Sequence, residues 1–132
     1  MSDHSAEYLQ AYGEFAKVIR TWFVAYGIGA PVLFLTNEKL SIALKQSGSA
    51  KCIAALFMAG VAFQVVIAAA NKFSMWGIYY AEINSNFKRH RRYKIAYWFS
   101  EAFWIDLITD LATMGLFGWA TWRVFAMVFL NA

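Results

Sequence analysis

Three long apolar stretches constrain this chain more than any other feature of its sequence. Val18–Thr36, Cys52–Asn71 and Phe103–Trp122 together take up nearly half of its 132 residues. Because an α-helix rises about 1.5 Å per residue, a stretch of roughly 20 residues matches the ~30 Å hydrocarbon core of a bilayer. The sequence therefore predicts an all-α integral membrane protein with three transmembrane helices, embedded in a lipid bilayer.

The composition leads to the same class. Hydrophobic residues make up 61% of the chain and charged residues only 15%, whereas soluble domains have about 45–50% apolar and 25% charged residues. Lipid accepts apolar stretches of this length directly, but a soluble fold would need a larger core than one small domain builds. The first seventeen residues offer no cleavable signal segment, so we expect the first span to act as its own insertion signal.

The segment before the first span has the pattern of an amphipathic helix over residues 5–19. Its apolar residues recur at helical spacing: Tyr8, Tyr12, Phe15 and Ile19. Two placements fit this pattern. The helix could lie in the lipid interface, or it could run straight into the first span, because nothing between Lys17 and Thr21 breaks it. We prefer a helix that lies in the interface or continues obliquely into the span.

The remaining elements complete a single membrane domain over residues 1–132. Glu38–Lys45 carries a short apolar stripe and ends before Ser47, Gly48 and Ser49, which predicts a brief interfacial helix after the first span. The spans are expected at approximately 18–36, 52–72 and 103–123, with a basic connection at 84–101.

The middle of the first span contains Gly27, Gly29 and Pro31. Proline removes a backbone donor and clashes with the preceding turn, and glycines make bending easier, so a kink is expected here. The kink has two interpretations, a gating hinge or a feature of helix packing.

Lysine and arginine residues predict the orientation. The N-terminal flank and the 81–101 connection hold seven of them, whereas the 37–51 connection holds three. The positive-inside rule then places the N-terminus in the cytoplasm and the C-terminus outside, in a bacterial inner membrane.

Five of the seven form the strongest charge cluster in the chain, here called the basic run: Lys88, Arg89, Arg91, Arg92 and Lys94. Such a run beside a span sets topology and attracts anionic lipids at about 1 kcal/mol per residue. It could also bind a phosphate-bearing ligand or dock to a protein partner. Nucleic-acid binding is not expected, because no folded domain accompanies the run and the net charge is only +4.

Polar residues inside the spans are the candidate functional residues, since each is costly unless paired or hydrated. On each helix they fall on one side at 100° per residue. The second span contributes Gln64, Asn71 and Lys72, and the third contributes Asp106, Thr109, Asp110 and Thr113. Because the second and third spans run in opposite directions, the end of the second lies beside the start of the third. We therefore expect Lys72 to approach Asp106 or Asp110. The residues either tie the bundle together or line a water-filled path.

Three helices from one chain enclose no usable pore, so a path requires several copies around an axis. Small residues make association of copies plausible. They form one face on each of two spans: Ala55, Ala59, Ala62, Val66 and Ala69, and Ala112, Gly115 and Gly118. The leading hypothesis is a homo-oligomer with an ion-conducting or membrane-permeabilising path. The alternative is a non-conducting protein that binds a membrane protein partner, as an immunity protein or an accessory subunit of a larger complex.

Enzymatic signatures are missing from the sequence. It has no Gly-rich phosphate loop, HExxH, CxxC or GxSxG motif. Cys52 is the only cysteine, and His4 and His90 do not complete a metal-ligand cluster at any recognised spacing. Asp106 and Asp110 lie on successive turns of one helix, where two acids usually find separate partners. We therefore expect neither an enzyme nor a bound cofactor or metal.

Overall fold

The computed structural model describes residues 3–129, and this part of the chain is all-helical, with 94% helix and no strand. Its elements follow in chain order: α1 (Asp3–Thr36), α2 (Glu38–Gln46), α3 (Ala50–Ile83), the 3₁₀ helix η1 (Ser85–Arg89), α4 (Arg91–Glu101) and α5 (Phe103–Phe129).

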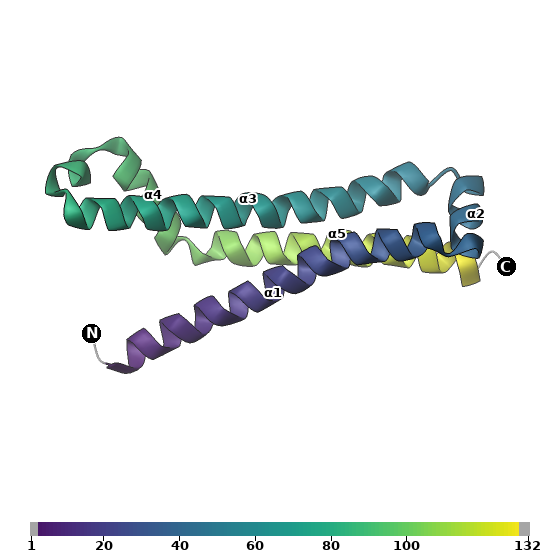
Figure 1. The fold of residues 1–132 in the computed structure, drawn as a ribbon, viewed down its shortest axis with the longest axis horizontal. Helices are drawn as coiled ribbons and strands as arrows, with labels where there is room; N and C mark the ends of the chain where they lie inside the picture. The colour runs from purple at the N-terminus through teal and green to yellow at the C-terminus, as the bar shows by residue number, and fades with distance from the viewer. Residues whose placement is uncertain (1–2, 130–132) are drawn as a thin grey trace.

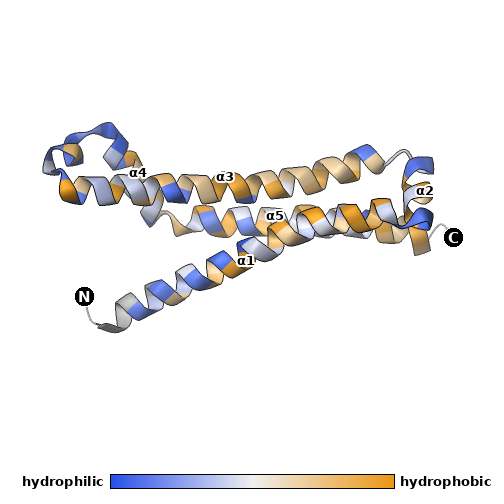
Figure 2. Ribbon diagram, viewed as in Figure 1, coloured by the Kyte–Doolittle hydropathy of each residue, from blue (hydrophilic) through white to orange (hydrophobic). Residues whose placement is uncertain are grey.

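Three long helices form an elongated bundle in which α3 runs antiparallel to α1 and α5 (Figure 1). The short α2 lies across one end, here called the α2 end. At the other end η1 and α4 fold back along α3, and we call this the basic end. Gln10–Thr36, Ala50–Ile83 and Phe103–Phe129 are each long and apolar enough to cross a membrane. In Figure 2 apolar residues dominate much of α3 and α5 and the half of α1 nearer to α2. The three helices indicate a membrane protein.

The amphipathic segment 5–19 is the N-terminal half of α1 and not a separate helix, so it continues into the first span. The helix also continues through Pro31. Only its C-terminal half packs closely, where Gly27 and Ala30 are buried, and the N-terminal half diverges from α3 and α5 (Figure 1). The first membrane helix therefore has one anchored half and one loosely held half.

The predicted short helix after the first span is confirmed as α2. The Asn37 side chain caps it by accepting a hydrogen bond from the Leu40 amide at 3.2 Å, and Leu44 buries its side chain against the bundle. Gly48 then turns the chain with a φ of +67°, which favours glycine.

The basic connection 84–101 holds more structure than its sequence indicated. It forms η1 and the eleven-residue helix α4, and α4 packs on the end of α3 through small residues. Ala81 and Ala96 are buried, and a Cβ atom at Gly77 would lie 3.1 Å from the Cβ of Ala96. This close contact explains why α4 folds back on α3.

The seam between α3 and α5 follows a heptad repeat. Buried residues on both helices recur at spacings of three and four, with one spacing of seven from Ile67 to Ser74, which is a period of 3.5. Those in the seam are Ile53, Phe57, Gly60, Gln64, Ile67 and Ser74 on α3, and Thr113, Phe117, Ala120 and Val124 on α5. Gly77 and Ala81 continue the same repeat along α3, where α4 packs on it. A regular seam of this kind holds two helices together along most of their length.

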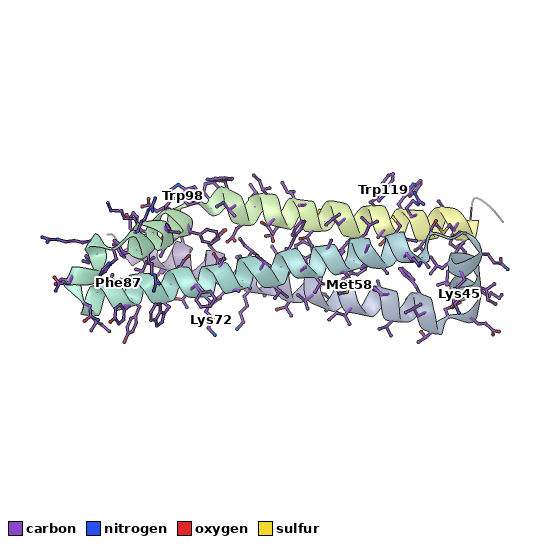
Figure 3. All side chains as sticks on the ribbon, turned by 90° about the horizontal axis from the view of Figure 1, so that it is seen from above. Lys45, Met58, Lys72, Phe87, Trp98 and Trp119 are labelled. Atoms are coloured by element: carbon purple, nitrogen blue, oxygen red, sulfur yellow. The ribbon has the colours of Figure 1, made fainter. Side chains whose placement is uncertain are left out.

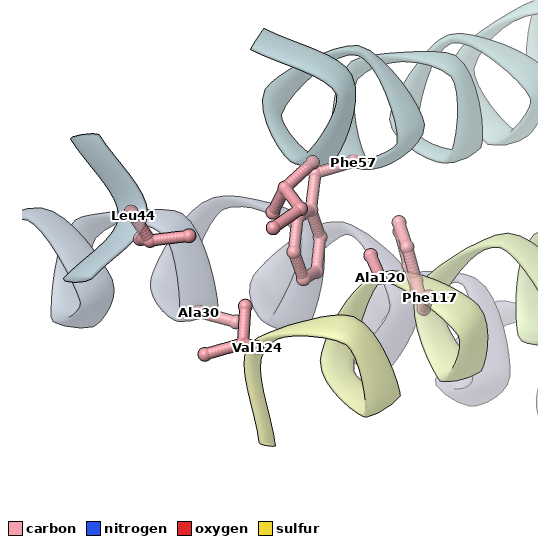
Figure 4. Packing of buried hydrophobic residues seen from close by; sticks show 7 residues of the cluster. Ala30, Leu44, Phe57, Phe117, Ala120 and Val124 are labelled. Carbon is pink, nitrogen blue, oxygen red and sulfur yellow. The ribbon is translucent and has the colours of Figure 1, made fainter. Parts of the chain in front are cut away.

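An aromatic layer closes the seam toward the α2 end. We define it as Phe57 and Phe117, whose rings stack at 5.4 Å between centroids, with Phe23 and Tyr26 from α1 against them. Figure 4 shows Phe57, Phe117 and Ala120 in this core. The Phe117 ring fits because Gly60 on α3 leaves room for it, and a Cβ there would lie 2.9 Å from Phe117 Cζ.

Replacing Gly60 by alanine should therefore destabilise the protein by about 1–3 kcal/mol, the usual cost of overpacking a core. The matched control is Gly115→Ala in α5, where an added Cβ meets nothing within 4 Å and stability should hold or rise slightly. Unfolding by sodium dodecyl sulfate in mixed micelles, followed by circular dichroism, measures both. Equal effects of the two substitutions would contradict the packing of Phe117 on Gly60.

Candidate functional site

Polar side chains from three helices meet where α1, α3 and α5 come together toward the basic end. Arg20 Nη2 lies 2.8 Å from Asp106 Oδ1, and these side chains are only 19% and 17% exposed. The Asn71 amide donates to the same carboxylate, at 3.1 Å to Oδ1 and 3.4 Å to Oδ2. Asp106 is thus matched by a cation from α1 and a neutral donor from α3.

A second group follows one turn further along α5. Gln64 Nε2 lies 3.0 Å from both Asp110 Oδ1 and Thr113 Oγ1, and it donates to each. The Thr113 hydroxyl donates to the Thr109 carbonyl at 2.8 Å. Gln64 is 1% exposed and Thr113 is fully buried. These bonds join α3 to α5 inside the chain.

The two groups together form what we call the polar cluster: Arg20, Gln64, Asn71, Asp106, Asp110 and Thr113. Two of its buried atoms, Arg20 Nε and Gln64 Oε1, have no hydrogen-bond partner among the described residues. Arg20 Nη2 lies within ion-pair distance of Asp106 without hydrogen-bond geometry. Buried atoms of this kind are ordinarily matched by ordered water, so the cluster has the donors and acceptors to hold internal water.

Clefts lie on both sides of Arg20. One, of about 260 Å³, has α1 on one side and α3, α4 and α5 on the other. Its polar lining residues include Tyr12, Asn71, Ser100 and Asp106. The other, of about 570 Å³, lies between α1 and α3, and Lys17, Thr21, Gln64 and Ala68 contribute to it. We call this second one the α1–α3 cleft. Beyond Thr113 the aromatic layer closes the seam, so the polar interior occupies only the half of the bundle toward the basic end.

The expectation that Lys72 pairs with Asp106 or Asp110 is wrong, because the ion-pair partner of Asp106 is Arg20. Lys72 is exposed, and its side chain points away from α5 (Figure 3). The physical reason is the 3.5-residue period of the seam, which buries Ile67 and Ser74 and leaves Lys72 outside. Thr109 uses its hydroxyl within α5, donating to the Ile105 carbonyl at 2.8 Å.

The other predicted site residues have separate surroundings. A Cβ at Gly27 would clash with Val61 and lie 2.7 Å from Phe117 Cζ, whereas one at Gly29 would meet nothing within 4 Å. Pro31 is half-buried, and α1 is one unbroken helix through all three residues. The basic run is exposed on η1 and the first turn of α4.

Arg20 is the residue that sequence reasoning missed as a member of the site. It entered only as a charge that sets orientation, although it lies inside the apolar stretch Val18–Thr36, where an ionisable residue already indicates a buried partner. Two further ties were also missed: Tyr26 Oη and Thr121 Oγ1 lie 2.7 Å apart, and Arg123 donates to Ser49 Oγ at 3.2 Å. They hold α5 to α1 and to the start of α3.

No family model, curated protein or solved structure matches this chain. Within residues 3–129 there is also no group of three or more histidine, cysteine or acidic side chains that could hold a metal ion. The polar cluster and its surroundings are therefore the basis for a functional proposal.

The ion pair and the exposed lysine give a direct contrast in stability. Arg20→Gln leaves Asp106 without its cation, and we expect it to destabilise the protein by about 2 kcal/mol, less than the ~3–5 kcal/mol of a fully buried pair. Lys72→Gln should cost less than about 0.5 kcal/mol. Unfolding by sodium dodecyl sulfate, followed by circular dichroism, measures both variants.

A third variant separates the cost of breaking the ion pair from the cost of losing the packing of the arginine side chain. The double variant Arg20→Gln with Asp106→Asn should recover part of the lost stability, because no uncompensated charge remains. If Lys72→Gln proved as costly as Arg20→Gln, the assignment of Arg20 as the partner of Asp106 would be wrong.

Proposed function

We propose that this protein is a non-conducting membrane protein that binds and restrains, or accompanies, another membrane protein. The observation that carries the proposal is the pairing within one chain of Asp106 with Arg20 and Asn71, and of Asp110 with Gln64. Side chains paired in this way act as internal ties between helices. Among the described residues, the atoms of the cluster that have no hydrogen-bond partner, such as Arg20 Nε and Gln64 Oε1, are buried inside the chain and form no exposed row that could line a pore between copies.

Association of copies through the small-residue faces would keep the polar cluster away from the axis. Ala62 and Ala69 on α3 are exposed, as are Gly115 and Gly118 on α5. Gln64 lies about 200° around α3 from Ala62 at 100° per residue, and it is almost fully buried. A homo-oligomer built on these faces therefore fits an interaction protein better than a channel.

The α1–α3 cleft is the partner-binding surface that we favour. Gly13, Ala25 and Ala68 line it with little side-chain volume, which permits close approach of another helix. Lys17 adds a donor to its lining, and the Thr21 hydroxyl, which donates to the Lys17 carbonyl at 2.8 Å, adds an acceptor. These features fit a transmembrane helix that carries an acidic or amide side chain at the level of Lys17. By the positive-inside rule this end would face the cytoplasm, across a bacterial inner membrane.

Ion conduction remains the second candidate, because clefts flank Arg20 and give access to the polar cluster on the basic side of the aromatic layer. Conduction through the interior of one chain would require Phe57 and Phe117 to separate. These rings are stacked, and both are buried. The structure of one chain thus offers half of a path, and opening the other half would disrupt the core.

The proposal predicts that the purified protein conducts no ions. Liposomes that contain it should keep a potassium or proton gradient as long as empty liposomes do, because the aromatic layer closes the bundle. Asp110→Asn should leave this result unchanged. Gradient collapse by the wild-type protein, and its loss in Asp110→Asn, would overturn the proposal and favour the channel.

A second readout in the same work tests the partner. A photo-crosslinking residue at Ala68, inside the α1–α3 cleft, should give a discrete adduct in the native membrane, whereas one at the neighbouring exposed Ala69 should not give that adduct. An adduct of twice the chain mass at position 68 would instead assign the cleft to self-association. Adducts at position 69 alone would contradict the cleft as the binding surface.

A further inference from the structure

We propose that the cleft between α3 and α4 is a binding site for one anionic phospholipid, with Arg92 on its phosphate and an acyl chain against the apolar wall. This site is separate from the polar cluster. It does not depend on whether the protein conducts ions or binds a protein partner.

The cleft combines an apolar wall with a single cation. Its volume is about 400 Å³, and Arg92 is the only charged residue in its lining. The side chains around it are mostly aromatic or aliphatic, and three of them are well exposed although they are large: Phe73, Trp76 and Ile95. A lipid chain would cover this surface, whereas a small soluble anion would make no contact with it.

The surroundings of Arg92 favour an anion. Arg92 has no acidic side chain within ion-pair distance among the described residues, and no acidic residue occurs between Glu82 and Glu101. The basic run adds four further cations within the seven residues from 88 to 94. Charge complementarity therefore selects an anionic headgroup over a zwitterionic one.

The start of α4 gives a second, independent reason. Its N-cap residue His90 makes no side-chain capping bond, and its first turn contains no acid. Arg91 and Arg92 instead occupy the first two helical positions, where the positive end of the helix dipole disfavours cations. A phosphate group beside Arg92 would offset the unfavourable interaction between the arginine charges and the helix dipole. It would also accept hydrogen bonds from the guanidinium group.

The position along α3 fits a lipid. The cleft extends from Ala70 to Gly77 on α3, a rise of about 10 Å. Ala70 lies within the apolar stretch that ends at Asn71, and Arg92 lies on α4 beyond that stretch. The apolar part of the site thus borders the expected hydrocarbon region, and its cation borders the expected headgroup region.

Native mass spectrometry of the full chain in detergent tests the site, with phosphatidylglycerol and phosphatidylcholine of the same acyl chains as probes. The wild-type protein should retain one phosphatidylglycerol and prefer it over phosphatidylcholine by about tenfold or more. Arg92→Gln should lose that preference. The matched control Arg89→Gln removes the same charge outside the cleft, and it should change the affinity by less than about twofold.

Further arms identify what is bound. Ile95→Trp, which fills the cleft and keeps every charge, should weaken retention of the lipid, and excess glycerol phosphate should not displace it. Equal losses in Arg89→Gln and Arg92→Gln would overturn the site in favour of diffuse attraction by the basic run. Displacement by glycerol phosphate would overturn the lipid in favour of a soluble phosphate ligand, and equal retention of both lipids would overturn the role of Arg92.

Discussion

The arrangement of the three long helices depends on how the carboxylate of Asp106 is matched. An ionised side chain within an apolar span is costly unless a partner neutralises it, and here the partners come from both other helices, Arg20 on α1 and Asn71 on α3. Arg20 and Gly27 are seven residues apart, so they lie on nearly the same face of α1. With that face turned toward α5, Arg20 contacts Asp106 and Gly27 packs against the Phe117 ring. These two contacts fix the rotation of α1 about its axis.

The bundle is divided into two halves with different chemistry. Toward the α2 end, stacked aromatic rings and small residues fill the space between helices, and direct bonds tie Tyr26 to Thr121 and Arg123 to Ser49. Toward the basic end, α1 diverges and the polar cluster lies between two clefts. The tight half supplies a rigid base, and the open half offers the surfaces on which another molecule can bind. This division is the physical basis for preferring an interaction protein.

The helices could be predicted from the sequence because length and apolarity determine them locally. The same holds for α2, whose cap and apolar stripe are contiguous in the chain. The pairing of charges could not be predicted in this way, because it depends on which residues a 3.5-residue seam buries. A stripe drawn at 100° per residue includes Lys72, whereas the heptad seam passes through Ile67 and Ser74 and excludes it. The fold-back of α4 was also missed, because Gly77, Ala81 and Ala96 reveal no contact until α3 and α4 are side by side.

The position of the polar cluster inside one chain is the central claim, and cysteine cross-linking tests it most directly. In a Cys52→Ser background, cysteines at positions 64 and 113 of the same chain should be joined by a short thiol cross-linker without any covalent dimer, because Gln64 and Thr113 are bonded within the chain at 3.0 Å. A mixture of chains that carry only one of the two cysteines should give no cross-link. Covalent dimers from that mixture would contradict the claim, because they would place the polar faces of α3 and α5 across an interface between copies.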